Sequence, residues 1–334
     1  MSNNKTKNSI CEEYYPISME ILQSFPKYRP QVDLFVFKED IAQLYPVAQK
    51  NARLTNEALE EITEACKQGI LFVSRSDQYI YVDLIAKQAE LVLFNSHLLE
   101  SEIVQILFQA LEMRLNNLYE QPLENYYTPL YKDVMVFCEY LWKDPKHINA
   151  FLPKIAQVQE FNLAVSGVVS LIVGTWLYFA ATKEPNRKNF ERLALGLILH
   201  NIGLSKVPLH IVNKTTPLNK EETEKYQAHV RQGSILLNKF GITFPATIDV
   251  VVQHHERIDG SGYPTRMGGD KISEYGCFAI VVDTFVDLLY PRHGAPKLSI
   301  LEVLAKMAKD SSLPLNLATI LVKGFAEVFA PKAS

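Results

Sequence analysis

Five side chains of the kinds that bind divalent metal ions recur in the second half of this 334-residue chain. They are His200, His229, His254, His255 and Asp283. Neutral imidazole and carboxylate groups together suit iron, manganese, zinc or nickel. Any one of these residues alone is more simply explained as a packed core or surface side chain. As a set on successive predicted helices, they favour a metal site in the interior of a helical bundle.

The stretch HHERIDGSGYP, residues 254–264, joins two of these histidines to a glycine-rich loop. Adjacent residues on a helix point about 100° apart, so His254 and His255 can approach one centre from two directions. The loop continues as far as Asp270 and interrupts two predicted helices. Loops of this composition in a helical domain often carry function. We therefore expect a metal site with a ligand-binding loop beside it.

Helices must position these residues, because apolar side chains recur at helical spacing through the second half of the chain. Ile103, Leu107, Leu111, Leu115 and Leu118 mark one helix near residues 101–120. Further helices are predicted over residues 131–148, 150–182, 188–201, 220–239, 245–257, 275–290, 298–309 and 315–329. Asn219 and Glu222 are spaced as a capping box at the start of the fourth of these.

The first part of the chain instead mixes strands with a helix. Strands are predicted over residues 32–37, 70–73 and 79–82, and Thr55 and Gly69 flank a predicted helix. This segment has no phosphate-binding loop or nucleophile elbow. The sequence thus predicts an α+β protein: a small α/β accessory domain (residues 1–90), a helical connecting region (91–150) and an all-α domain (151–330).

Composition limits the function classes. The chain has 48% hydrophobic and 21% charged residues and a net charge of −3, which fits a globular protein and argues against a DNA partner. Four widely spaced cysteines and a polar N-terminus favour a reduced, cytoplasmic protein without a signal peptide. Residues 161–182 carry no charge and are long enough to span a membrane. A helix buried in a bundle has the same pattern, and we favour it.

Four segments resemble, in order, the HD-GYP subgroup of the HD-superfamily phosphohydrolases: LILHNIGLSKVPLHIVNKTTPLNKEE, QAHVRQGSILL, VVQHHERIDGSGYPTRMGGDKIS and AIVVDTFVDLLYPR. The resemblance implies a bacterial cyclic di-GMP phosphodiesterase with an all-α HD-type bundle. It also implies two or three metal ions, commonly iron or manganese, with a bridging hydroxide that attacks phosphorus. The ligand would be cyclic di-GMP or a related dinucleotide. A protein partner or a homodimer is left open.

The resemblance also assigns roles to residues. The catalytic His-Asp pair corresponds to His200 and Asn201. The metal ligands correspond to His200, His229, His254, His255 and Asp283. The residues facing the nucleotide correspond to Gly262, Tyr263 and Arg292, with Lys206 near the position of the usual lysine. The residues that order the loop correspond to Glu256, Arg257 and Asp259.

Several departures from the family pattern put two-metal catalysis in doubt. Asn201 stands where the family has aspartate, Leu204 where it has lysine, and Val165 where it has an early histidine. An acidic ligand found in some members would fall near Phe161. Two dications about 3.5 Å apart repel by about 19 kcal/mol at an effective dielectric near 20, so the missing anionic bridge matters. Three imidazoles can still hold a single ion.

The resulting hypothesis is a degenerate HD-GYP protein that binds cyclic di-GMP or a partner with little or no hydrolysis, holding one ion or none. One alternative is an active phosphodiesterase with an atypical metal set, in which a residue such as Glu256 or Asp259 replaces the missing carboxylate. The other alternative is a scaffold without ligand binding, similar to the HDOD domains. The intact glycine loop argues against the scaffold.

Overall fold

The computed structural model describes residues 13–38, 41, 43–77, 85–93, 98–158 and 162–330. The chain divides into two compact units, Met1–Ala110 and Leu111–Ser334. The division falls within the long helix α5 (Glu100–Glu120). Each unit is described by itself.

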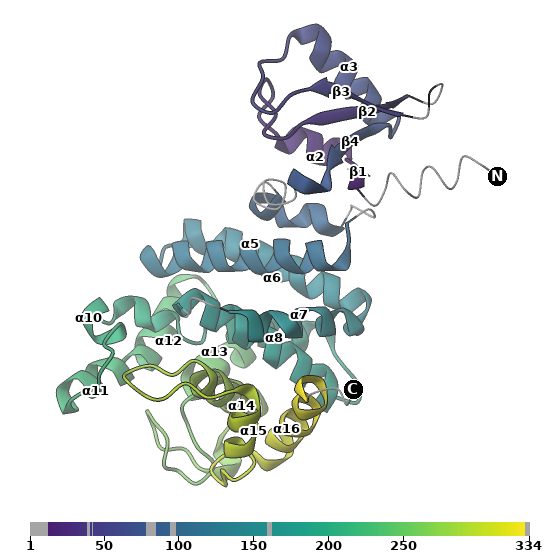
Figure 1. The fold of residues 1–334 in the computed structure, drawn as a ribbon. Helices are drawn as coiled ribbons and strands as arrows, with labels where there is room; N and C mark the ends of the chain where they lie inside the picture. Colours follow the sequence, from purple (N-terminus) through teal and green to yellow (C-terminus); the bar gives the residue numbers. More distant parts are fainter. Residues whose placement is uncertain are drawn as a thin grey trace. The chain divides into compact units, whose positions relative to one another are not determined.

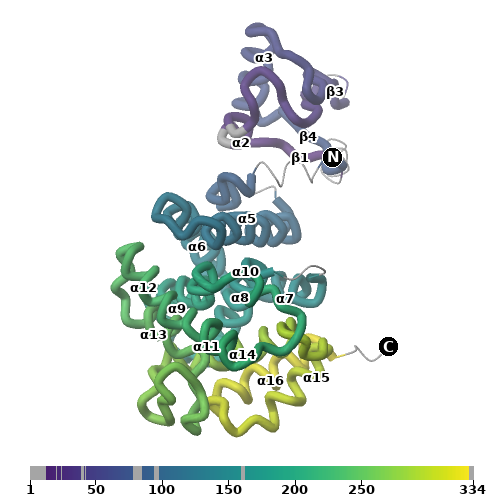
Figure 2. The backbone as a smooth tube through the Cα atoms, turned by 90° about the vertical axis from the view of Figure 1, so that its left-hand side faces the viewer, coloured from purple at the N-terminus to yellow at the C-terminus, as the bar shows by residue number. Residues whose placement is uncertain are grey.

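The first unit contains a four-stranded antiparallel sheet in the order β1-β4-β2-β3. Figure 1 labels its four strands, and Figure 2 traces the same backbone from another side. Its strands are β1 (Tyr14–Pro16), β2 (Leu34–Lys38), β3 (Gln43–Ala48) and β4 (Leu71–Ser74). Its helices are α2 (Met19–Ser24), α3 (Asn56–Lys67) and the 3₁₀ segments η1 (Arg75–Asp77) and η2 (Ala86–Leu93). The predicted α+β class is confirmed. The strand predicted over residues 79–82 lies outside the described residues.

Local chemistry explains which elements of this unit the sequence predicts. The hydroxyl of Thr55 accepts the backbone N–H of Ala58 at the start of α3, as expected of an N-cap. Gly69 follows the helix with a φ of +68°, a conformation that glycine adopts without strain. The sequence analysis missed β3, which contains Pro46. A proline is tolerated there because β3 is an edge strand of the sheet.

The second unit is helical throughout the part that the structure describes (Figure 1). Its longer helices after α5 are α6 (Glu124–Lys143), α7 (Ile148–Gln157), α8 (Leu163–Ala181), α9 (Arg187–Leu199), α11 (Lys220–Gln227), α12 (His229–Lys239), α13 (Pro245–Gln253), α14 (Glu274–Leu289), α15 (Ile300–Met307) and α16 (Leu315–Phe329). Shorter pieces are η3 (Pro145–His147), η4 (Ile202–Lys206), α10 (Leu209–Val212) and η5 (Gly269–Lys271).

Two helices predicted as continuous are each divided. The segment 150–182 contains α7 and α8, and α8 begins where the Asn162 side chain accepts the backbone N–H of Val165. The segment 220–239 contains α11 and α12, which meet at Ala228. The predicted capping box of Asn219 and Glu222 is confirmed. Apolar residues lie on both sides of the first break, so hydrophobic spacing alone does not detect it. The polar helix α11 joins α12 without a glycine or proline to mark the turn.

Helix α8 accounts for the uncharged stretch of the sequence. It is long and apolar enough to cross a membrane, but most of it is buried within the second unit. It packs against α7, α9, α14 and α16 (Figure 1). Gly167 and Gly174 allow the close approach of Leu115 and Leu197, respectively. These contacts are those of a helix in the core of a bundle.

Gly203 is the point of closest packing between η4 and α12. A Cβ atom at this position would lie 1.9 Å from the carbonyl oxygen of His229 and 2.6 Å from the backbone nitrogen of Gly233. Both neighbours are backbone atoms, so neither can rotate away. This glycine contact holds the turn that carries His200 against the start of the helix that carries His229.

We predict that Gly203→Ala lowers the free energy of unfolding by roughly 3 kcal/mol or more, because overpacking against backbone forces η4 and α12 apart. Urea denaturation measures this loss. Ser205→Ala is the matched control, since it removes one hydroxyl that donates to the Ile202 carbonyl and should cost about 1 kcal/mol. Equal stability of the two variants would contradict the account of the η4 contact.

Candidate metal centre

The five predicted ligands come together at the ends and faces of four packed helices. His200 directly follows α9, His229 is the first residue of α12, His254 and His255 directly follow α13, and Asp283 lies within α14. All five side chains are buried. The ring centroid of His254 lies 5.1 Å from that of His200, 5.3 Å from that of His229 and 4.2 Å from that of His255.

Three of the histidines have their Nδ1 atoms fixed by helix carbonyls. His200 Nδ1 lies 2.6 Å from the Leu197 carbonyl, and His254 Nδ1 lies 2.8 Å from the Val251 carbonyl. His229 Nδ1 lies 2.7 Å from the carbonyl of Tyr226 in the last turn of α11. Carbonyls in the last turn of a helix have no partner within the helix. A neutral imidazole that donates from Nδ1 has an unprotonated Nε2, so each ring presents a lone pair at Nε2.

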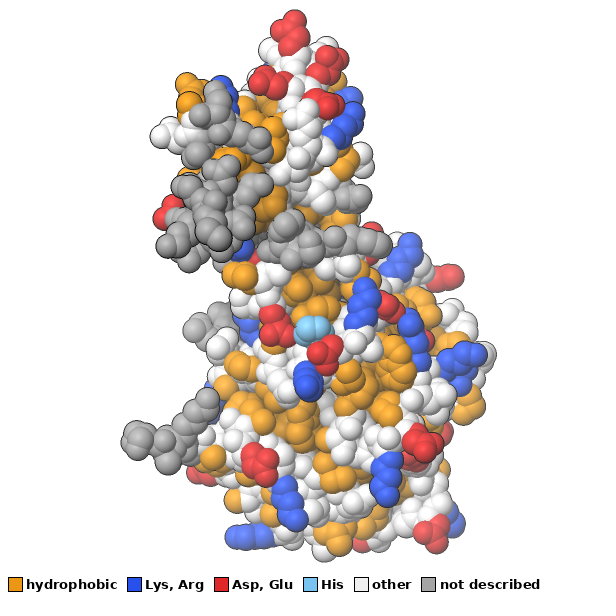
Figure 3. Space-filling view, turned by 90° about the vertical axis from the view of Figure 1, so that its right-hand side faces the viewer, with side chains coloured by type: hydrophobic (Ala, Val, Ile, Leu, Met, Phe, Trp, Pro, Cys, Tyr) orange, Lys and Arg blue, Asp and Glu red, His pale blue; other side chains and the backbone are white. Residues whose placement is uncertain are grey.

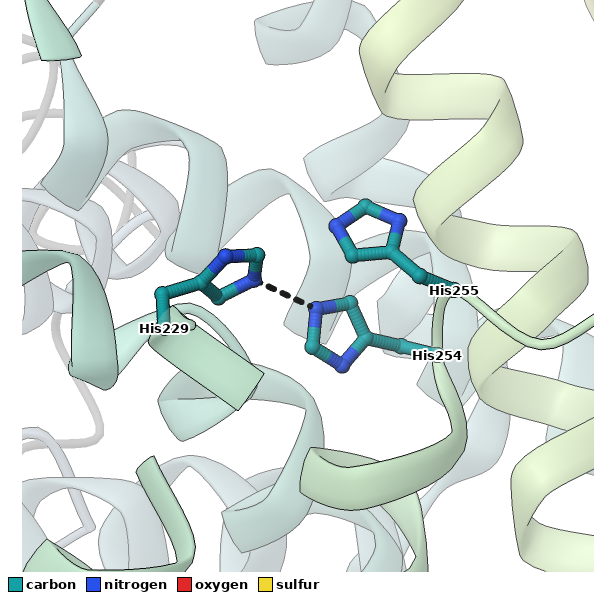
Figure 4. Close-up of side chains that lie close together, drawn as sticks. All are labelled: His229, His254 and His255. Carbon is teal, nitrogen blue, oxygen red and sulfur yellow. Dashed lines mark hydrogen bonds between the residues drawn. The ribbon is translucent and has the colours of Figure 1, made fainter. Parts of the chain in front are cut away.

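The Nε2 atoms of His229 and His254 face each other at 3.1 Å (Figure 4). If both are unprotonated, two lone pairs meet and repel. Burial, together with the charge of His255, lowers the pKa of His229 and the pKa of His254 well below the usual value, which disfavours a bridging proton. A cation between the rings relieves this repulsion. The donors therefore fit a metal ion held by His229, His254 and His255, whose ligand atoms lie within 4.8 Å of one another.

The other side of the site is different because the Asn201 side chain is hydrogen-bonded to the His200 ring. The Asn201 side-chain N–H₂ donates to His200 Nε2 at 2.8 Å. Since Nδ1 of the same ring is bound to the Leu197 carbonyl, this bond takes up the remaining lone pair. An aspartate has no N–H to donate and would leave that lone pair available. The amide thus removes the charge expected at this position and also blocks the adjacent imidazole as a ligand.

Asp283 carries the negative charge within the pocket. Its Oδ2 atom lies 3.1 Å from His255 Nδ1, and its Oδ1 atom lies 3.3 Å from His200 Nε2. Burial would raise the pKa of the Asp283 carboxyl, but the charge of His255 holds that pKa well below its usual range. Neither carboxylate oxygen has a hydrogen bond among the described residues. An ionised carboxylate in this position is a natural ligand for a cation.

The sequence analysis missed Asp287. One ligand atom from each of His255, Asp283 and Asp287 lies within 4.8 Å of the other two. Asp287 is four residues after Asp283, so the two side chains lie on one face of α14. This spacing was the available signal, but acidic pairs four residues apart are common on helix surfaces.

The glycine loop is ordered by a buried acid. The Glu256 carboxylate accepts hydrogen bonds from the Thr265 backbone N–H, the Thr265 hydroxyl and the Met267 backbone N–H. Asp259 accepts from the backbone N–H and hydroxyl of Ser261. The Arg257 side chain donates to the Glu256 carbonyl. All three side chains thus bond to groups in or beside the loop, and their loop-ordering role stays a prediction.

The predicted nucleotide-facing residues fall into different places. Gly262 is buried, and a Cβ there would lie 2.5 Å from backbone atoms of residues 255–257. The Tyr263 ring stacks on His255 with centroids 4.6 Å apart, and burial raises the pKa of Tyr263 well above its usual value. Arg292 Nη2 lies 3.0 Å from Asp287 Oδ1. Lys206 is exposed at the end of η4. Their ligand contacts stay predictions.

Two of the positions that depart from the family pattern, Leu204 and Val165, are apolar and buried. Leu204 is 1% exposed and packs with Val207, Ile211 and Val212, against which Tyr119 and Tyr226, among others, also pack. Val165 is 3% exposed within α8. Phe161 lies outside the described residues. Where the family pattern has polar groups, residues 165 and 204 of this chain contribute to hydrophobic packing.

A cavity of about 470 Å³ opens beside this cluster. It is lined by residues of three segments: Asn162 and Leu163, Val212–Thr215, and Pro291–Ala295. The Tyr226 ring contacts the rings of both His229 and His293, with centroids 5.3 and 5.0 Å apart. Tyr226 thus links the histidine cluster to the cavity wall.

Comparison with known proteins finds relatives of the second unit. Residues 154–313 match the HD domain family. Over 88 residues the chain is 34% identical to the 3′3′-cGAMP-specific phosphodiesterase 2 of Vibrio cholerae. The matched segment covers 26% of this chain and 17% of that protein. Over 98 residues the chain is 36% identical to the cyclic di-GMP phosphodiesterase response regulator RpfG of Xanthomonas campestris. That segment covers 28% of this chain and 25% of the regulator.

A solved structure resembles nearly the whole chain. It is Bd1817, described as a HDG"Y"P protein from Bdellovibrio bacteriovorus, and it covers 94% of this chain and 99% of its own length with a TM-score of 0.59. At 16% identity this likeness shows the fold alone. Residues 154–313 therefore resemble HD domains, and the predicted resemblance to the HD-GYP proteins is confirmed. The matched segments span a quarter or less of the length of these two curated relatives.

We predict that Glu256→Gln loosens the loop of residues 257–272 and lowers the free energy of unfolding by roughly 2–4 kcal/mol, because an amide group would face three donors. Hydrogen exchange at the amides of Thr265 and Met267 reports the loosening directly. Asp259→Asn is the control, since its carboxylate is exposed and should cost much less. Unchanged protection of both amides in Glu256→Gln would show that another contact orders the loop.

Proposed function

We propose that this chain is a cyclic dinucleotide-binding regulator with an eroded HD-GYP metal site and little or no hydrolysis. Its three-imidazole set would hold a single divalent ion, most readily iron or manganese. The observation that carries the proposal is the hydrogen bond from Asn201 to His200 Nε2. That bond leaves the side of the pocket beside Asp283 without a free imidazole at position 200.

The apolar neighbours of Asn201 support the same conclusion. Leu204 contributes to a hydrophobic cluster, and Val165 is buried in the bundle. Negative charge develops on the oxygen atoms of a phosphodiester in the transition state of hydrolysis, and enzymes stabilise this charge with cationic donors. The carbon atoms at these two positions can supply no such donor. One bound ion would still provide charge to orient a phosphate or to acidify a water.

The cavity beside the cluster supports ligand binding. Its walls include Arg292, His293 and Lys214. Arg292 Nη1 is buried without a hydrogen bond among the described residues, so it can donate to an anion. Lys214 pairs with Glu222 at the rim. Basic and acidic side chains are mixed on the face that Figure 3 draws, so that face presents no broad basic surface to an anion.

The curated relatives act on cyclic dinucleotides by name, and the ordered glycine loop of this chain matches the family motif. We therefore propose cyclic di-GMP or a related dinucleotide as the ligand. The division into residues 1–90, 91–150 and 151–330, the cytoplasmic location, and a homodimer or protein partner also remain proposals.

We predict one tightly held ion per chain after purification without added metal. Inductively coupled plasma mass spectrometry measures its identity and number. His254→Ala should remove this ion, because it deletes one of three ligands and a locked Nε2 lone pair. The control is His210→Ala, which changes an exposed histidine outside the cluster. Two ions per chain at full occupancy would overturn the single-ion proposal.

We further predict that cyclic di-GMP binds without rapid turnover. Isothermal titration calorimetry should show binding, while liquid chromatography of product with added manganese or iron should show little cleavage. Asn201→Asp alone should not restore hydrolysis, since Leu204 and Val165 still supply no polar group. Absence of any binding heat or thermal shift would favour a non-binding scaffold. Fast cleavage by the unmodified chain would favour an active phosphodiesterase with an atypical metal set.

A further inference from the structure

The first unit contains an apolar recess of about 260 Å³, formed by helices α2 and α3, strand β2 and the segments that join them (Figure 1). Most of the residues that line it are hydrophobic, and Leu34 and Ile62 among them are almost fully buried. Thr63 also lines the recess, but its hydroxyl already donates to the Leu59 carbonyl at 2.7 Å. Packed interiors contain few voids larger than a water molecule. We call this feature the α2–α3 recess.

The rim of the recess is a preformed structure. Two segments, residues 26–30 and residues 50–54, contribute to it, and two backbone hydrogen bonds join them. One of these bonds runs from the Leu54 N–H to the Tyr28 carbonyl at 2.9 Å. The first segment begins and ends with proline, which fixes the backbone angle φ at both positions. A rim that is already ordered lowers the entropic cost of binding a ligand there.

The rim is basic. Its two segments carry the exposed cations Lys27, Arg29 and Arg53 and contain no aspartate or glutamate. Lys27 lines the recess itself, and it is the one charged residue that does so among the described residues. The acid that follows the first segment, Asp33, accepts the backbone N–H of Lys50 at 2.6 Å. The mouth of an apolar recess is therefore positively charged, which favours a ligand with an acidic head group.

A polar hollow of about 590 Å³ adjoins the recess. It is lined by Tyr28, Arg53, Leu54, Thr55 and Asn56. Leu54 also lines the recess, so the hollow and the recess share one wall. The Lys27 Nζ atom lies 5.4 Å from the centroid of the Tyr28 ring, beside the hollow. A carboxylate in the hollow would meet the Lys27 ammonium and the Arg53 guanidinium, and guanidinium groups bind carboxylates through two parallel hydrogen bonds.

The volume of the recess sets the length of the apolar chain that it can hold. A dry apolar cavity of about 150 Å³ binds benzene, which has six carbon atoms. By that measure a recess of about 260 Å³ holds roughly ten carbon atoms. The lining offers such a chain hydrophobic contacts along its length, and each methylene removed from water should raise the affinity by about fourfold.

We propose that the α2–α3 recess binds a medium-chain fatty carboxylate of about ten carbons, with its chain in the recess and its head group between Lys27 and Arg53. The site lies wholly within the first unit, so it depends neither on the metal centre nor on binding of a cyclic dinucleotide. It gives the accessory unit a ligand of its own. Such a site needs neither the phosphate-binding loop nor the nucleophile elbow that the sequence of this unit lacks.

Isothermal titration calorimetry of the full chain with hexanoate, octanoate and decanoate tests the proposal. The affinity should rise by about fourfold for each added methylene, because each one leaves water. Dodecanoate should gain little over decanoate, since its extra carbons would lie outside the recess. Decyltrimethylammonium has a chain of the same length and the opposite charge, and it should bind about tenfold more weakly than decanoate. Absence of decanoate binding below the concentration at which it forms micelles would overturn the proposal.

A charge reversal tests the contact with the head group. Lys27→Glu should weaken decanoate by about tenfold and strengthen decyltrimethylammonium by a similar factor, because it replaces an attraction at the rim by a repulsion. Lys38→Glu is the matched control, since it makes the same change at an exposed residue of β2, at the end of the strand away from Leu34. Equal decanoate affinities of these two variants would refute the role of Lys27 and with it the carboxylate.

A substitution that fills the recess tests the contact with the chain. Leu59→Trp adds bulk from α3 and should abolish decanoate binding. Glu61→Trp is the control, because it places the same side chain at an exposed position of the same helix. Decanoate that binds equally to both variants would place the ligand elsewhere. If Leu59→Trp does not fold by circular dichroism, Thr63→Phe fills the recess from the next turn and decides in the same way.

The recess and the proposed function of the second unit fail separately. Lys27→Glu and Leu59→Trp should leave the bound metal ion in place, since both positions belong to the first unit. Decanoate binding in a chain that binds no cyclic di-GMP would keep the recess and refute the proposed function. A chain that binds cyclic di-GMP but not decanoate would refute the recess alone.

Discussion

The structure of the site depends on the tautomers of three buried histidines. Each ring follows the end of a helix and binds a carbonyl of its last turn through Nδ1. These carbonyls lack partners within their own helices, and the C-terminal ends of helices carry partial negative charge. The rings therefore turn their unprotonated Nε2 atoms inward, where no solvent screens them. A pocket built in this way favours a cation and disfavours a proton.

The same constraint makes position 201 decisive. Replacing a carboxylate oxygen by an amide N–H₂ turns an acceptor into a donor, and the nearest acceptor is the Nε2 lone pair of His200. The amide nitrogen of Asn201 thus takes the place of a negatively charged oxygen, and it also uses the lone pair through which His200 could bind a metal ion. Leu204 and Val165 complete the change by placing hydrocarbon where the family pattern has polar groups. The site is consequently asymmetric, with lone pairs on one side and an amide, a carboxylate and apolar carbon on the other.

The glycine loop has kept its internal order although the catalytic positions differ. A buried glutamate holds residues 265 and 267, and a glycine at 262 lets the chain pass within contact of residues 255–257. The stacked Tyr263 then lies directly over His255. Ordering of the loop and chemistry at the metal are therefore separate properties of this fold.

The sequence by itself determined the α+β class, the helical second half, the capping box at Asn219 and the candidate ligands, because helix periodicity, caps and imidazole side chains are local properties. It did not reveal the helix break before Leu163, where apolar residues lie on both sides, or the break at Ala228, where no glycine or proline marks the turn. The tertiary structure alone decided which lone pairs face one another, that Asn201 binds His200, and that Asp287 joins His255 and Asp283. Those facts depend on distances between helices far apart in sequence, which packing at contacts such as Gly203 sets.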